Sequence, residues 1–111
     1  MMKKTGKVFY KEIYAGTIEQ SEGEYRFTYD DKFLNHPHAH AISFTLPLRK
    51  EPYKDKTLIP FFDGLIPEGW LLHIAEKNWK IDPKDRMSLL LTICEDCIGA
   101  VKIKDASTNE V

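Results

Sequence analysis

Three histidines separated by single residues form the first group in this chain that could do chemistry. They are His36, His38 and His40, and Pro37 stands between the first two. Proline favours an extended conformation in the residue before it, and an extended segment places alternate side chains on one face. Three imidazoles on one face could ligate zinc or nickel. The sequence offers no obvious acidic or thiol fourth ligand nearby, so we expect an exposed polar loop without a bound metal.

Two cysteines, Cys94 and Cys97, have the C-x-x-C spacing of redox motifs and of half a zinc site. The first use needs a thioredoxin-like βαβ unit, and the second needs another pair of ligands. Neither context is present in the sequence. A structural disulfide is also not expected in a reducing cytoplasm. We therefore expect two small, buried or half-buried side chains where a helix meets a strand.

No group of residues has the spacing of a catalytic site. The sequence lacks a nucleophile beside a base, a convincing pair of carboxylates and a glycine-rich phosphate loop. Gly64 and Gly69 bracket a stretch that differs in spacing from a G-x-G-x-x-G loop and contains Pro67. The nucleotide-binding lysine strand, the His-Arg-Asp-like loop and the Asp-Phe-Gly-like metal site of kinases are also absent from the sequence. We expect no enzyme activity and no cofactor.

Trp70 is the side chain best placed to contact a partner. It follows Gly69 at the start of an expected helix, outside the strongest part of that helix's apolar stripe. A large aromatic beside a glycine-bounded turn can project into a partner's pocket as an anchor. The alternative is that Trp70 packs on Phe61 or Phe62 within the hydrophobic layer. Trp79, by contrast, fits the apolar stripe, and we expect it in the core.

Charged and flexible neighbours extend this candidate site. Asp63 and Glu68 could place negative charge near Trp70, although the helix dipole alone explains acidic residues at a helix start. The candidate partner-binding residues are Asp63, Gly64, Glu68, Gly69 and Trp70.

The composition favours a single cytoplasmic domain with protein partners. The chain has 111 residues, of which 42% are hydrophobic, and this suits one globular domain over residues 1–111. Sixteen basic and 17 acidic residues give a net charge of −1, so no general field draws in nucleic acid or an anionic membrane. No apolar run reaches the ~18 residues of a membrane span, and no signal-peptide core follows the N-terminus.

The first half of the chain alternates apolar and polar residues with period two, which predicts strands. A first strand is expected around residues 8–10, with a turn at Ala15–Gly16. A second turn is expected at residues 21–23, before the clearest strand, Tyr25–Tyr29. A further strand is predicted over residues 42–46, ended by a proline, and residues 49–56 then form a surface loop.

Helical spacing begins only after Pro67. The first predicted helix carries an apolar stripe made of Leu71, Ile74, Ala75 and Trp79. The second is expected to have Asp82 as its cap and Pro83 at its first position. Its stripe consists of Met87, Leu90, Leu91 and Cys94. A closing strand over 98–103 and a polar tail over 104–111 complete the chain. The predicted fold class is α+β, a small antiparallel β-rich domain, either a meander or a partly open barrel, with two helices in the C-terminal half.

Several blocks in a fixed order resemble the N-terminal subdomain of HipA-type serine/threonine kinase toxins. They read AISFTLPL at 41–48, FFDGLIPEG at 61–69, SLL at 88–90 and DCIGAV at 96–101. In that family this subdomain is a small antiparallel β-rich unit with helices that sits against the kinase N-lobe. ATP, magnesium and catalytic groups belong to later parts of the polypeptide. Only about ten residues follow Val101, so we expect the kinase body to be absent.

A free-standing copy of this subdomain is similar to the HipS family of small antitoxins, from tripartite HipBST toxin–antitoxin systems. The resemblance implies a protein that binds a HipA-like serine/threonine kinase toxin and inhibits it by occupying or distorting the active-site cleft, with Trp70 as the inserted side chain. The alternative is a structural subunit that completes a split, active kinase. A HipB-like DNA-binding protein could join the complex, while direct nucleic-acid binding by this chain is not expected. An exposed edge at Tyr25–Tyr29 could support a homodimer.

Overall fold

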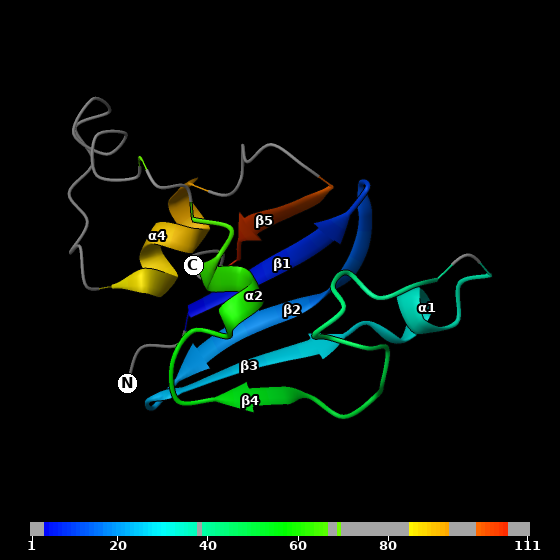
Figure 1. Ribbon diagram of the computed structural model, residues 1–111, viewed down its shortest axis with the longest axis horizontal. Coiled ribbons are helices and arrows are strands. Elements are labelled where there is room, and N and C mark those ends of the chain that lie inside the picture. Colours follow the sequence, from blue (N-terminus) through cyan, green and yellow to red (C-terminus); the bar gives the residue numbers. More distant parts are fainter. Residues whose placement is uncertain (1–3, 38, 67–68, 70–84, 94–99, 107–111) are drawn as a thin grey trace.

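The computed structural model describes residues 4–37, 39–66, 69, 85–93 and 100–106. Its centre is one antiparallel sheet with the strand order β4-β3-β2-β1-β5 (Figure 1). The strands are β1 (Lys4–Tyr10), β2 (Ile13–Ser21), β3 (Glu24–Tyr29), β4 (Tyr53–Asp55) and β5 (Val101–Asp105). β1 to β4 are successive neighbours and β5 returns to pair with β1, so the sheet is an open meander with one added strand. The predicted antiparallel α+β fold is confirmed.

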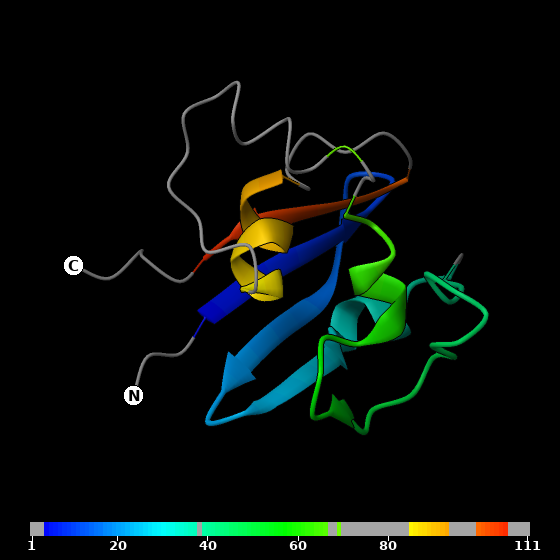
Figure 2. The same ribbon diagram turned by 60° about the vertical axis from the view of Figure 1, so that its left-hand side comes forward.

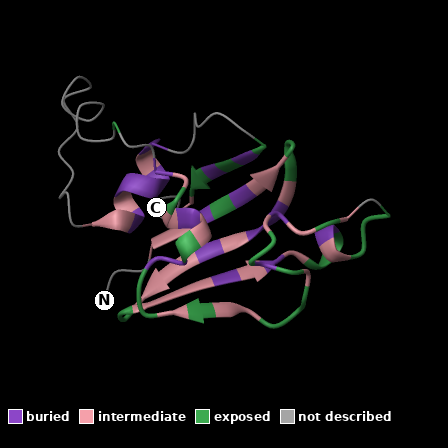
Figure 3. Cartoon of the chain, viewed as in Figure 1, coloured by how far each residue is buried: buried purple, intermediate pink, exposed green. Residues whose placement is uncertain are grey.

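One face of the sheet carries the hydrophobic core. Alternate residues of the strands, among them Val8, Ile18, Phe27 and Ile103, have no exposed surface. The helices α2 (Pro60–Asp63) and α4 (Arg86–Ile93) lie over this face (Figure 2). α4 contacts β1 and β5, and it contacts α2 beside it. Figure 3 shows that buried positions recur along the strands and on these two helices.

The predicted turn at Ala15–Gly16 is wrong. The β1–β2 turn lies earlier, at Lys11 and Glu12, whose φ angles are 51° and 70°. Gly16 instead lies inside β2, where a Cβ atom would stand 2.2 Å from the carbonyl oxygen of Thr28 on β3. Glycine is therefore required there by close contact between strands and not by a turn. The predicted second turn is confirmed at Glu22 and Gly23, where φ is also positive.

The strand predicted over residues 42–46 is also wrong, because this segment makes a compact turn. The N–H of Leu46 bonds to the carbonyl oxygen of Ser43, and the hydroxyl of Tyr29 bonds to both Ile42 and Leu46. These bonds satisfy the backbone locally and leave no need for a strand partner. The apolar alternation correctly marks Ile42 and Leu46 as buried, but Phe44 is fully exposed.

Short elements appear where loops were predicted. Asp30 caps α1 (Asp31–Leu34) by accepting a hydrogen bond from the N–H of Lys32, and α1 lies beyond the ends of β2 and β3 (Figure 1). β4 occupies part of the predicted loop 49–56. α2 begins at Pro60, so the prediction that helical structure begins only after Pro67 is wrong. β3 is an inner strand between β2 and β4, not the predicted edge.

The last two described elements differ from prediction mainly in their bounds. α4 begins at Arg86, with Asp85 before it, while the predicted cap Asp82 and the predicted first residue Pro83 lie outside the described residues. Met87, Leu90 and Leu91 are buried as predicted. β5 continues through Lys104 and Asp105, which pair with β1, so the predicted polar tail begins inside a strand. The predicted helix over 71–79 and Cys94 lie outside the described residues.

Replacing Gly16 with alanine should destabilise the domain by about 1–3 kcal/mol, the usual range for forcing extra volume into a packed site. The reason is that the new methyl group would meet the backbone of β3, which cannot move aside without disturbing the sheet. Urea denaturation of Gly16→Ala measures the loss. Gly69→Ala is the matched control, because a Cβ at this exposed glycine meets nothing within 4 Å. Equal stability of the two variants would contradict the assignment.

Candidate protein-docking site

The residues expected to contact a partner begin at the end of α2. Pro60 is the first residue of this helix, a position where a backbone N–H would have no partner within the helix, so proline costs no hydrogen bond there. Phe62 is completely buried, and its ring centroid lies 5.1 Å from that of Phe27 on β3. Phe61 packs edge-on against Phe62. A helix of four residues is not stable alone, so this aromatic contact with the sheet fixes the position of α2.

Asp63 is the first predicted site residue, and it makes an ion pair within the domain. Arg86 Nε donates to Asp63 Oδ1 at 2.7 Å. The two side chains are 35% and 42% exposed, so solvent screens part of the attraction. The pair joins the last residue of α2 to the first residue of α4. Arg86 had no signal in the sequence, because an ion pair across 23 residues has no local pattern.

Both described glycines of the predicted site are exposed. Gly64 ends α2 in a right-handed conformation, and its N–H bonds to the carbonyl oxygen of Pro60 at 2.9 Å. A Cβ at Gly64 would make only ordinary contacts, and one at Gly69 would meet nothing. Neither position requires glycine for packing. Glu68 and Trp70 lie outside the described residues.

Asp85 is a second charged residue that the sequence did not single out. Its Oδ1 accepts a hydrogen bond from the N–H of Ser88 at 3.0 Å, and its Oδ2 lies 2.6 Å from Lys4 Nζ. Asp85 therefore caps α4 and ties it to the start of β1. Burial raises the pKa of the Asp85 carboxyl, but hydrogen bonds from Lys4 and Ser88 outweigh burial and leave the pKa below its ordinary value.

The histidines offer no metal site in the described part of the chain. His36 and His40 are exposed, and the His40 ring packs edge-on against Tyr10 at a centroid distance of 4.9 Å. His38 lies outside the described residues, as do Cys94 and Cys97. Among the described residues, no three histidine, cysteine or acidic side chains are grouped to hold a metal ion.

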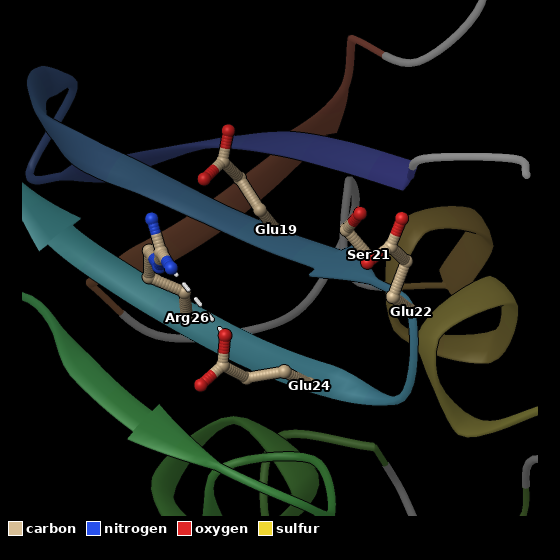
Figure 4. Close-up of a pocket in the computed structure, with 5 residues that line it drawn as sticks. All are labelled: Glu19, Ser21, Glu22, Glu24 and Arg26. Carbon is tan, nitrogen blue, oxygen red and sulfur yellow. Dashed lines mark hydrogen bonds and ion pairs between the residues drawn. The ribbon is translucent and has the colours of Figure 1, made fainter.

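The opposite face of the sheet has a hollow of about 280 Å³ over the β2–β3 hairpin (Figure 4). Arg26 on β3 pairs with Glu24 at 3.3 Å, and further carboxylates surround this pair. An acidic lining repels phosphate, and no histidine lines the hollow to activate Ser21. The lining residues are Glu19, Ser21, Glu22, Glu24 and Arg26. Their types do not form a catalytic site.

The sequence profile of the HipA N-terminal domain family matches residues 6–104. This chain belongs to the HipA N-terminal domain family. The match takes in nearly all of the sheet, the three described helices and the whole 63–70 stretch. It agrees with the resemblance noted in the sequence.

Three similar proteins show how this domain occurs elsewhere. An uncharacterised protein of Haemophilus influenzae is 31% identical over 102 residues, which are 92% of this chain and 92% of that protein. The candidate kinase Y4mE of Sinorhizobium fredii is 27% identical over 85 residues, which are 77% of this chain but 20% of that protein. A solved structure of the N-terminal domain of HipA toxin has a TM-score of 0.71 and 26% identity, and covers 95% of this chain and 94% of that one.

Removing the Asp63–Arg86 ion pair should weaken the joint between α2 and α4 by a measurable coupling energy. A double-mutant cycle of Asp63→Asn, Arg86→Gln and the double variant, followed by urea denaturation, isolates that energy. We expect about 0.2–1 kcal/mol, because both side chains are partly exposed. Strict additivity of the two single changes would mean that the pair does not hold the helices together.

Asp85→Asn should lower stability at neutral pH, while keeping an oxygen that can cap α4. The folded pKa of Asp85 is lowered, so its stabilising effect is present above its ordinary pKa of 3.8 and is lost as pH falls through the folded pKa. We expect a deficit of about 0.5–1 kcal/mol at pH 7 that shrinks towards about pH 2. Urea denaturation across this range measures it, with Glu22→Gln as the control for losing an exposed carboxylate. A deficit that is constant with pH would contradict the role of the charge.

Proposed function

We propose that this domain binds a HipA-like serine/threonine kinase and inhibits it, as the antitoxin of a toxin–antitoxin system. The observation that carries the proposal is the match of residues 6–104 to a domain that also forms the N-terminal domain of HipA toxin. The Haemophilus influenzae relative supports action as a separate polypeptide, because the aligned region makes up 92% of that protein. A domain that packs against a kinase within one chain has a surface that fits the same kinase as a separate chain.

The proposed inhibitory contact is the stretch that begins at α2. Phe62 and the Asp63–Arg86 ion pair hold the end of α2 against the core, so the chain leaves Gly64 from a fixed point. Fixing the origin of a docking segment reduces the entropy lost on binding. Trp70 then enters the kinase cleft as the anchor, and Glu68 and Gly69 flank it. An indole in the cleft excludes nucleotide or distorts the residues that bind it.

A second candidate function is a structural subunit that completes a split, active kinase. The solved N-terminal domain of HipA toxin favours it, because in that protein the domain is part of the toxin itself. Both functions use the same docking surface, and both allow a HipB-like DNA-binding protein in the assembly. The net charge of −1 gives this chain no general attraction for DNA, so any operator contact belongs to that third protein.

Co-expression with a HipA-like kinase from the same genome tests the two functions. For an antitoxin, we expect the chain to co-purify with the kinase, restore growth and suppress kinase autophosphorylation. Trp70→Ala should remain folded by circular dichroism but lose the suppression, because the anchor is gone. Phe9→Ala is a control, since this half-buried aromatic lies on the opposite face of the sheet from the core.

Two outcomes would overturn inhibition. If the kinase phosphorylates itself and arrests growth only when this chain is present, the chain is an activating subunit. If the purified chain and kinase do not associate at all, both candidate functions fail.

A further inference from the structure

Phe44 is the most exposed large apolar side chain in the described part of the molecule. Its relative exposure is 103%, while Ile42 and Leu46 on either side are 7% and 2% exposed. Burying a phenylalanine side chain is favourable by about 1.5–3 kcal/mol, and Phe44 gains none of this within the domain. The loop between α1 and β4 thus anchors two apolar residues in the core and presents the one between them to solvent.

The turn that carries Phe44 is held in one conformation by Tyr29. We call residues 42–46 the Phe44 turn. The Tyr29 hydroxyl accepts from the N–H of Ile42 at 3.1 Å and donates to the carbonyl oxygen of Leu46, so one side chain joins both ends of the turn. Burial raises the pKa of the Tyr29 hydroxyl, which keeps the proton that it donates.

Bonds inside the turn complete this arrangement. The N–H of Thr45 bonds to Ser43 Oγ at 3.2 Å, and the N–H of Leu46 bonds to the Ser43 carbonyl oxygen at 3.1 Å. Tyr29 itself is held by parallel stacking on the Phe33 ring of α1. The backbone around Phe44 is therefore ordered before any partner arrives, and an aromatic side chain has few rotatable bonds to restrict on binding.

We propose that Phe44 is a second anchor, which inserts into an apolar pocket on the body of the HipA-like kinase. This inference rests on the proposed function. The Phe44 turn lies within residues 6–104, which match the family. In the candidate kinase Y4mE the aligned region is only 20% of the protein, so there the domain is joined to a much larger polypeptide. A rigid, solvent-exposed aromatic on such a domain fits the interface with that polypeptide.

The rim of the Phe44 turn suits an anchor of this kind. Thr45 beside it is exposed and polar, and the exposed, charged Arg49 and Lys50 follow on the same loop. The hydroxyl of Tyr53 donates to the carbonyl oxygen of Pro47 and keeps this loop close to β4. An apolar anchor with a polar rim has the arrangement of a binding hot spot.

The competing receptor is a second copy, whose hollow of about 200 Å³ is lined by residues that include Tyr10, Ile13 and Phe33.

Binding measurements on the purified full chain and kinase test this proposal. Phe44→Ser should bind the kinase about 10- to 100-fold more weakly than the unaltered chain, as truncated anchors do. Phe44→Leu, which stays apolar, should bind within about tenfold of the unaltered chain. Because Phe44 is fully exposed, both variants should keep the melting temperature of the unaltered chain within about 2 °C. Phe9→Ser is a control for losing an aromatic on the opposite sheet face, and its melting temperature is measured as well because Phe9 is half-buried beside Tyr14.

Tyr29→Phe adds an independent test, because it leaves Phe44 in place but removes the hydroxyl that joins the ends of the turn. We expect a lowered melting temperature together with weaker kinase binding, since an unlocked turn must be ordered on association. Kinase binding equal to that of the unaltered chain would show that the locked turn contributes nothing.

The outcomes separate this inference from the proposed function. If the unaltered chain binds the kinase and Phe44→Ser binds within about threefold of it, the anchor is refuted and the proposed function stands. If the unaltered chain does not bind the kinase, both are refuted. If light scattering shows self-association that Phe44→Ser abolishes, while kinase binding is unaffected, Phe44 belongs to a homodimer contact instead.

Discussion

A small sheet with one apolar face must have that face covered, and the rest of the described structure depends on this constraint. The covering helices are short: α2 has four residues and α4 has eight. Helices of this length are unstable in isolation. Each is therefore held by particular side chains. Phe62 packs on Phe27, Asp63 pairs with Arg86, and Asp85 both caps α4 and reaches Lys4 on β1. Contacts with the sheet and with each other therefore fix the positions of α2 and α4.

The sequence predicts the parts of the fold that depend on local rules. Alternation marks β3, and the Ser21-Glu22-Gly23 sequence marks the turn at Glu22 and Gly23. Local rules fail at Gly16, because a glycine needed for close strand contact has the same signature as one in a turn. They fail again at the Phe44 turn. There the Tyr29 hydroxyl of β3 bonds to the backbone of Ile42 and Leu46, so the segment needs no hydrogen bonds to a neighbouring strand. The ion pairs of Asp63 and Asp85 join distant residues, which no short pattern reveals.

The candidate site, like the fold, has parts that the sequence predicts and parts that depend on contacts between distant residues. The resemblance in the blocks at 41–48 and 61–69 identifies the domain, and the family match agrees with it. The sequence names Asp63 only as a possible charge near Trp70. It indicates neither that Asp63 ends a helix nor that its carboxylate pairs with Arg86. At Phe44 the sequence pattern is misleading. The alternation of apolar residues predicts that Phe44 is buried like Ile42 and Leu46, whereas in the turn its side chain is exposed to solvent.

β3 connects the two proposed anchoring regions. Phe27 receives Phe62 and so places the end of α2, from which the stretch leading to Trp70 departs. Tyr29, two residues further on the same face, holds the Phe44 turn, and the two rings touch edge-on with centroids 4.9 Å apart. A shift of β3 by one residue would turn both aromatic rings to the other face of the sheet. Both docking segments would then lose their supports together. The strand with the clearest sequence signal thus sets the geometry of the surface through which we propose the domain acts.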